Sequence, residues 1–147
     1  MRFMLLLKAN AQTEAGVPPS AELIAAMGRY NEEMVKAGVL LAGEGLQPTA
    51  KGARVRFSGP SRTVTLGPFD ASKDLLAGFW LIQVPSREAA IEWVKRCPHP
   101  HAVGEAEIEI RQVFEAADFP ADVFPPEEVA REEALRAEMA KKGGPRA

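Results

Sequence analysis

Apolar and polar residues follow two periods along this chain, one typical of strands and one typical of helices. Residues 2–8 and 77–84 are short runs that are apolar at nearly every position, which indicates strands covered on both faces. Residues 105–114 alternate between apolar and charged positions, so we predict a strand with one polar face. Residues 39–46 are predicted as a fourth strand, in which two glycines indicate a bulge or a close backbone approach.

Two amphipathic helices are predicted between these strands. The first begins at Ser20, a favourable N-cap, and ends at Gly38, which suits a left-handed turn. The second begins at Ser86 and ends before Pro98, which cannot continue a helix. The apolar stripe of the first helix consists of Leu23, Met27, Tyr30 and Met34.

The remaining segments predict a hairpin, two connections and a tail. Residues 53–57 and 62–66 form the hairpin, joined by turn-forming residues. Residues 9–19 are predicted as a loop, and residues 70–76 have room for one helical turn. The tail contains a charged helix over residues 127–141, whose apolar stripe is thin.

This order of elements predicts an α+β fold. Without the hairpin it is a split βαβ, the ferredoxin-like pattern. We predict one domain over residues 1–116 and a helical extension over residues 117–147. Two helices cover one face of such a sheet, and apolar burial contributes about 25 cal/mol per Å². A second copy is the simplest cover for the other face, so we expect a homodimeric α+β barrel with a cavity between the sheets.

Composition excludes several classes of function. The formal net charge is −2, and no basic run with interleaved aromatic residues is present, so we expect no direct binding of nucleic acid. No apolar run reaches membrane-spanning length, and the N-terminal run is too brief for a signal peptide. Cys97 is the only cysteine, which excludes an intramolecular disulfide. We therefore expect a cytoplasmic protein.

No motif in the chain predicts a cofactor or a metal. A glycine-rich phosphate loop, a nucleophile elbow and paired cysteines are all missing. Cys97, His99 and His101 have the chemistry of zinc ligands, but their spacing matches no established zinc motif. Cys97 completes a helix stripe, which favours a buried structural thiol. Either histidine could serve as a base at the end of the barrel.

Several segments resemble the YCII-related proteins, and specifically their DGPF subgroup. The resemblance extends from residue 1 to about residue 119 and is carried by GEGLQP at 43–48, GPF at 67–69, the run 77–98 and AEIEIRQVFE at 106–115. It implies a ferredoxin-like dimeric barrel without a settled activity. Some members are suggested to be enzymes that act on small organic molecules. DGPF-type proteins often accompany extracytoplasmic-function sigma factors, which implies a regulatory setting.

The chain departs from the subgroup's pattern at two acidic positions. Leu66 occupies the place of the eponymous Asp, and Ala71 occupies the place of a second acid, whereas Lys73 and Asp74 keep the pattern's Lys–acid pair. The His/Asp pair of the YciI type cannot be assigned to particular residues. We therefore expect binding rather than proton-transfer catalysis.

The residues themselves indicate where a ligand would bind. Glu44 lies between two glycines, and a carboxylate inside an apolar barrel is suited to proton transfer; the alternative is an edge-strand Glu in water. Arg111 offers a planar clamp for an anion. Glu44 and His99 are the catalytic candidates. The full set of predicted ligand-binding residues is Glu44, Phe69, Asp70, Trp80, His99 and Arg111.

Some of these residues have simpler structural interpretations. Phe69 can line the mouth of the cavity or plug a Gly-Pro turn, and Asp70 can cap the turn that follows. Trp80 fits the core and could instead face the cavity. Two functions therefore stay open: a small-molecule-binding barrel that could act as a cofactor-independent enzyme, and a non-catalytic regulatory or interaction protein associated with sigma-factor-dependent transcription.

Overall fold

The computed structural model describes residues 1–70, 74–102 and 104–143. The chain forms two compact units, Met1–Val113 and Phe114–Ala147. The division falls close to residue 116, after which we predict the extension to begin.

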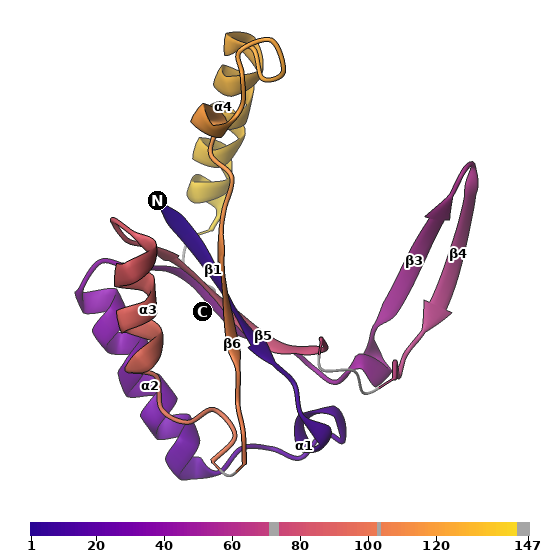
Figure 1. The fold of residues 1–147 in the computed structure, drawn as a ribbon, viewed down its shortest axis with the longest axis vertical. Helices are drawn as coiled ribbons and strands as arrows, with labels where there is room; N and C mark the ends of the chain where they lie inside the picture. Colours follow the sequence, from indigo (N-terminus) through magenta and orange to yellow (C-terminus); the bar gives the residue numbers. More distant parts are fainter. Residues whose placement is uncertain (71–73, 103, 144–147) are drawn as a thin grey trace. The chain divides into compact units, whose positions relative to one another are not determined.

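The first unit contains two antiparallel sheets (Figure 1). The larger sheet has the strand order β2-β5-β1-β6, and the smaller one is the β3-β4 hairpin. The strands are β1 (Arg2–Lys8), β2 (Leu40–Gly45), β3 (Ala53–Ser58), β4 (Ser61–Leu66), β5 (Leu76–Gln83) and β6 (Ile108–Gln112).

The helices follow the predicted plan with one addition. They are α1 (Ala11–Glu14), α2 (Ala21–Lys36), α3 (Arg87–Lys95) and α4 (Pro126–Lys142), with 3₁₀ turns at Thr49–Lys51 and Ala116–Asp118. The predicted caps are confirmed. The Ser20 hydroxyl accepts the N–H of Leu23, and the Ser86 hydroxyl accepts the N–H of Ala89, each at 3.1 Å. Gly38 follows α2 with a φ of 72°, which glycine adopts without strain.

Each long helix of this unit connects two strands that are not neighbours in the sheet. The helix α2 leads from β1 to β2, with β5 lying between them, and α3 leads from β5 to β6, with β1 between them. This is the split βαβ connectivity, so the α+β class is confirmed and the topology is consistent with a ferredoxin-like fold.

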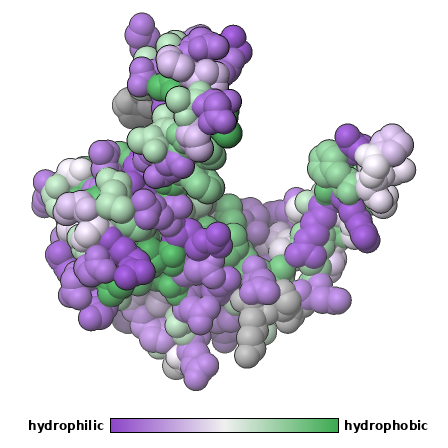
Figure 2. Space-filling view, turned by 45° about the horizontal axis from the view of Figure 1, so that its top comes forward, coloured by the Kyte–Doolittle hydropathy of each residue, from purple (hydrophilic) through white to green (hydrophobic). Residues whose placement is uncertain are grey.

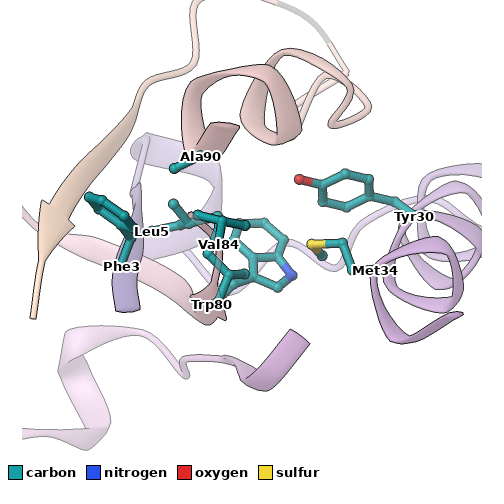
Figure 3. Packing of buried hydrophobic residues seen from close by; sticks show 8 residues of the cluster. Phe3, Leu5, Tyr30, Met34, Trp80, Val84 and Ala90 are labelled. Carbon is teal, nitrogen blue, oxygen red and sulfur yellow. The ribbon is translucent and has the colours of Figure 1, made fainter. Parts of the chain in front are cut away.

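One face of the sheet packs against α2 and α3. The core residues are Phe3, Leu5, Tyr30, Met34, Trp80, Ile82, Val84 and Ala90, and Figure 3 shows most of them converging between the sheet and the helices. Burying each large apolar side chain contributes about 1.5–3 kcal/mol. The Tyr30 hydroxyl donates to the carbonyl of Trp93 at 2.8 Å. Burial raises the pKa of Tyr30 well above its usual range, so this hydroxyl stays protonated and remains a donor.

Two local predictions are wrong. The loop predicted over residues 9–19 contains α1, which Asn10 and Thr13 hold in a reciprocal capping box of 2.9 Å hydrogen bonds. The last strand begins later than predicted, because its partner strand β1 ends at Lys8. Before Ile108, the pairing continues only through the hydrogen bond from the Lys8 N–H to the Glu107 carbonyl, at 3.0 Å. Residues 71–73 of the predicted helical turn lie outside the described residues.

The hairpin is amphipathic. In its register Val55 pairs with Val64 and Phe57 with Arg62. Val55, Phe57 and Val64 therefore lie on one side, with Arg62 over the Phe57 ring, and Arg54 and Arg56 lie on the other. Every hairpin side chain is exposed. In Figure 2 the hairpin accordingly carries both hydrophobic and hydrophilic surface.

Candidate functional site

The second face of the four-stranded sheet is apolar at its centre. Side chains alternate along a strand, so Met4, Leu6, Phe79 and Leu81 point away from the core residues beside them. Met4 pairs with Leu81 and Leu6 with Phe79, and all four are half-buried. We call this surface the open face. Within residues 1–113, the described helices α2 and α3 pack on the other side.

Glu44 and Arg111 lie at opposite edges of the open face. Glu44 pairs with Phe79 at the β2 edge, and Arg111 pairs with Met4 at the β6 edge. Three strand spacings of about 4.8 Å, with an offset of two residues along the strands, separate the two positions by about 16 Å. The structure therefore does not bring the predicted acid and anion clamp together around one ligand within the chain. Both residues are exposed, and Arg111 already contacts Glu109, with Nη1 3.4 Å from Oε2.

Trp80 lies on the core side of the sheet. Its indole N–H donates to Oδ1 of Asn31 at 2.9 Å, and its ring meets Tyr30 edge-on. A Cβ at Gly43 would lie only 2.9 Å from the indole, so this glycine permits the close approach of β2. The register also shifts between Leu40 and Ala42. Of the two alternatives predicted for the glycines of β2, the close approach is present at Gly43, whereas the register shift lies before both glycines. Trp80 serves the core instead of a ligand cavity.

A pocket of about 410 Å³ lies at the base of the hairpin, and we call it the hairpin-base pocket. Its walls include Leu46, Lys51, Arg54, Phe69, Asp74 and Leu75. Phe69 was predicted to bind ligand and lines this pocket, whereas the exposed Asp70 beside it is not among the lining residues. Ala71 and Lys73 lie outside the described residues.

Thr49 holds the hairpin base together. Its hydroxyl donates to Oε2 of Glu14 at 2.6 Å and accepts the backbone N–H of Phe69 at 3.1 Å. The Thr49 N–H donates to Oε1 of Glu14 at 3.3 Å. A Cβ at Gly67 would lie 1.6 Å from the Thr49 carbonyl oxygen, so only glycine fits there. Sequence reasoning missed this network; the Asn-x-x-Thr capping box before Glu14 is its one local signal.

The charges in the hairpin-base pocket are unevenly distributed. The guanidinium carbon of Arg54 lies 3.9 Å from the centre of the Phe69 ring, a cation–π contact. Lys51 adds a second cation, and its Nζ lies 3.3 Å from Oε1 of Gln47. The acidic lining residue Asp74 is 3.7 Å from the ammonium group of Lys8, which offsets its charge. The pocket thus combines apolar walls with a cationic side.

A second pocket, of about 540 Å³, lies at the end of β1. We call it the histidine pocket; it is lined by Lys8, Ala9, His99, His101, Glu105, Ala106 and Glu107. Nδ1 of His99 accepts the backbone N–H of His101 at 3.3 Å, and its Nε2 lies 2.9 Å from the carbonyl of Gly104. Both ring nitrogens of His99 are therefore engaged in holding the turn, which leaves its neutral ring no free lone pair for catalysis.

Cys97 is a half-buried thiol in the core between α2 and α3. Its sulfur lies 3.9 Å from that of Met27, and burial raises its pKa to about 11. A thiol with this pKa is protonated and unreactive near neutral pH. Among residues 1–70, 74–102 and 104–143, no group of three His, Cys, Asp or Glu side chains is arranged to hold a metal ion.

The connectivity defines an α+β protein with an inserted hairpin, consistent with a ferredoxin-like fold. The family model of the YCII-related domain matches residues 1–117, so the chain belongs to the YCII-related family. No curated protein was found to match it. None of the described helices is both long and apolar enough to cross a membrane.

Proposed function

We propose that this chain is a DGPF-type, small-molecule-binding protein that acts in the cytoplasm as a homodimer and binds an organic anion in the hairpin-base pocket. The observation that carries the proposal is the stacking of Arg54 on Phe69, at 3.9 Å, beside Lys51 in a pocket with largely apolar walls.

The chemistry of Arg54 indicates the class of ligand. A guanidinium that places its face on an aromatic ring keeps its N–H groups at the rim, where they bind a carboxylate in a bidentate manner. The apolar walls suit a hydrocarbon or aromatic body attached to that carboxylate. A volume of about 410 Å³ is within the usual range for small-molecule sites. Leu66 replaces the subgroup's acid and is exposed, which favours binding without proton transfer.

Calorimetric titration of the full chain with aromatic and aliphatic carboxylates, each beside its uncharged amide, tests this function. R54Q should weaken carboxylate binding at least tenfold and leave amide binding unchanged. R56Q is the matched control, because Arg56 lies on the same strand and the same side of the hairpin but is not among the residues lining the pocket. Equal losses in both variants, or no preference for carboxylates, would contradict the proposal.

The homodimer rests on the open face. Its central residues Met4, Leu6, Phe79 and Leu81 are large and apolar, and the charged Glu44 and Arg111 lie at its rims. An apolar centre with a polar rim is the usual anatomy of a protein–protein interface. A second copy placed against this face would close the expected α+β barrel, and C2 dimers are the commonest assemblies.

The exposed hairpin supports a second candidate, a non-catalytic interaction protein associated with sigma-factor-dependent transcription. Val55, Phe57 and Val64 form an exposed apolar surface on one side of the hairpin, and a lone two-stranded hairpin is marginally stable in water. Hydrogen exchange over residues 53–66 of the purified protein separates the two candidates. Rapid exchange would show that the hairpin surface is uncovered and available to another protein, which favours the interaction protein. Strong protection would show that the surface is already covered, which disfavours it.

A further inference from the structure

Within the part of the chain that the structure describes, the imidazole of His101 has a hydrogen-bond partner at one of its two ring nitrogens. The residue is 9% exposed, and its Nε2 lies 3.0 Å from the backbone carbonyl of Lys8. A carbonyl oxygen can only accept a hydrogen bond, so Nε2 carries the proton. In the neutral ring, Nδ1 is therefore left as an acceptor with a lone pair.

This lone pair faces accessible space. Among the described residues, no side chain is hydrogen-bonded to Nδ1 of His101, and no fully buried side-chain nitrogen or oxygen lacks a partner. Nδ1 must therefore be within reach of solvent, although the residue as a whole is buried. Because His101 lines the histidine pocket, the pocket is the space from which a molecule can reach this nitrogen.

The other groups of the pocket are mostly acceptors as well. Glu105 and Glu107 both line it with exposed carboxylates. Lys8 is the lining residue with a cationic side chain, and its Nζ lies 3.7 Å from carboxylate oxygens of both Asp74 and Glu109. The pocket accordingly favours a ligand that donates hydrogen bonds and carries positive charge.

We propose that the histidine pocket is a second binding site, which takes a small molecule with a protonated amine. The ammonium group donates to Nδ1 of His101, and Glu105 and Glu107 offset its charge. The Lys8 carbonyl accepts the Nε2 proton and so fixes the tautomer that leaves Nδ1 free to accept, as the hydrogen-bond partners of functional histidines commonly do. The site is separate from the hairpin-base pocket and does not depend on the proposed binding of carboxylates there.

Titration of the full chain with propylamine and benzylamine, each compared with the corresponding alcohol, tests the proposal. The ¹⁵N NMR chemical shifts of the His101 ring should show the Nε2–H tautomer, and the Nδ1 resonance should shift as amine is added. H101Q retains an N–H donor for the Lys8 carbonyl but removes the ring nitrogen Nδ1, and its amide oxygen does not occupy the same position, so it should weaken amine binding at least tenfold. The E105Q/E107Q double variant, which changes only exposed side chains, should weaken it as well.

Two controls make the outcome decisive. E92Q changes an exposed carboxylate on α3 outside the pocket and should leave amine binding unchanged, as should R54Q. If H101Q fails to fold, the double variant and the NMR shift still decide. The proposal is overturned if amines do not move the His101 resonance, if alcohols bind equally well, or if neither variant weakens binding. Zinc binding through His101 without amine binding would also overturn it.

Discussion

The hydroxyl of Thr49 accepts a hydrogen bond from the backbone N–H of Phe69 at 3.1 Å, across twenty positions of sequence. The same hydroxyl donates to Glu14, so one side chain fixes the aromatic wall of the hairpin-base pocket to the short helix α1. This contact, together with the 3.0 Å hydrogen bond from the Gly67 N–H to the Gly52 carbonyl, fixes the position of Phe69 and with it the stacking of Arg54.

Replacing Thr49 with valine should loosen the hairpin base. T49V keeps the shape of the side chain but leaves Oε2 of Glu14 and the Phe69 N–H without the hydroxyl that they share, which costs about 1–3 kcal/mol. We expect a lower midpoint in urea unfolding and weaker carboxylate binding. T63V, on the exposed hairpin opposite Arg56 and outside the pocket lining, is the control and should change neither measurement.

Adding a methyl group at Gly67 should be far more damaging than adding one at Gly45. The Cβ of G67A would overlap the Thr49 carbonyl oxygen, whereas no atom lies within 4 Å of the corresponding position at Gly45. We expect G67A to lower the free energy of unfolding by several times as much as G45A, measured by thermal and urea unfolding. Comparable values for the two variants would show that the hairpin base relaxes without cost.

A charge at the centre of the open face should separate the proposed dimer. Lysine in place of Leu6 would be buried without a partner between two copies, so L6K should elute as a monomer in size-exclusion chromatography with light scattering. V35E adds a charge at an exposed position on α2 and should leave the mass unchanged. A wild-type chain that is already monomeric at micromolar concentration would contradict the dimer.

The thiol of Cys97 should react slowly with iodoacetamide near neutral pH and much faster in urea. Burial raises its pKa in the folded chain to about 11 from an ordinary value of 9.0, so the folded chain retains the thiol proton to a higher pH than the unfolded chain does. This contribution to stability is complete below pH 9 and is lost as the pH rises toward 11. C97A should therefore show a smaller loss of stability over that window than the wild type.

Removing the chain from Asp118 onward should lower the melting temperature. Phe119 contacts Phe114 and Phe124, with ring centres 4.9 and 5.9 Å apart, and we predict that this aromatic tail docks on the body of the protein or on a second copy. The helix α4 has a thin apolar stripe, which makes it marginal alone. If the truncated chain melts and assembles like the full one, the tail is an independent appendage.

Most of the secondary structure could be predicted from the sequence, because most elements depend on local signals. Apolar periodicity predicts β1, β5, α2 and α3, and the serines that begin the two helices act as caps, as expected. The order of elements leads to the split βαβ pattern. The helix α1 was missed, because four residues are too few to show a helical period and its capping box is the only local signal.

The sites depend on contacts between residues far apart in the sequence, and only the tertiary structure shows these. Strand register places Glu44 and Arg111 at opposite edges of one face, although each alone looked suited to a shared ligand. His99 and His101 are nearly equivalent in the sequence. The path of the turn past β1 engages both nitrogens of His99 but leaves one on His101 open, because the Lys8 carbonyl reaches only its Nε2.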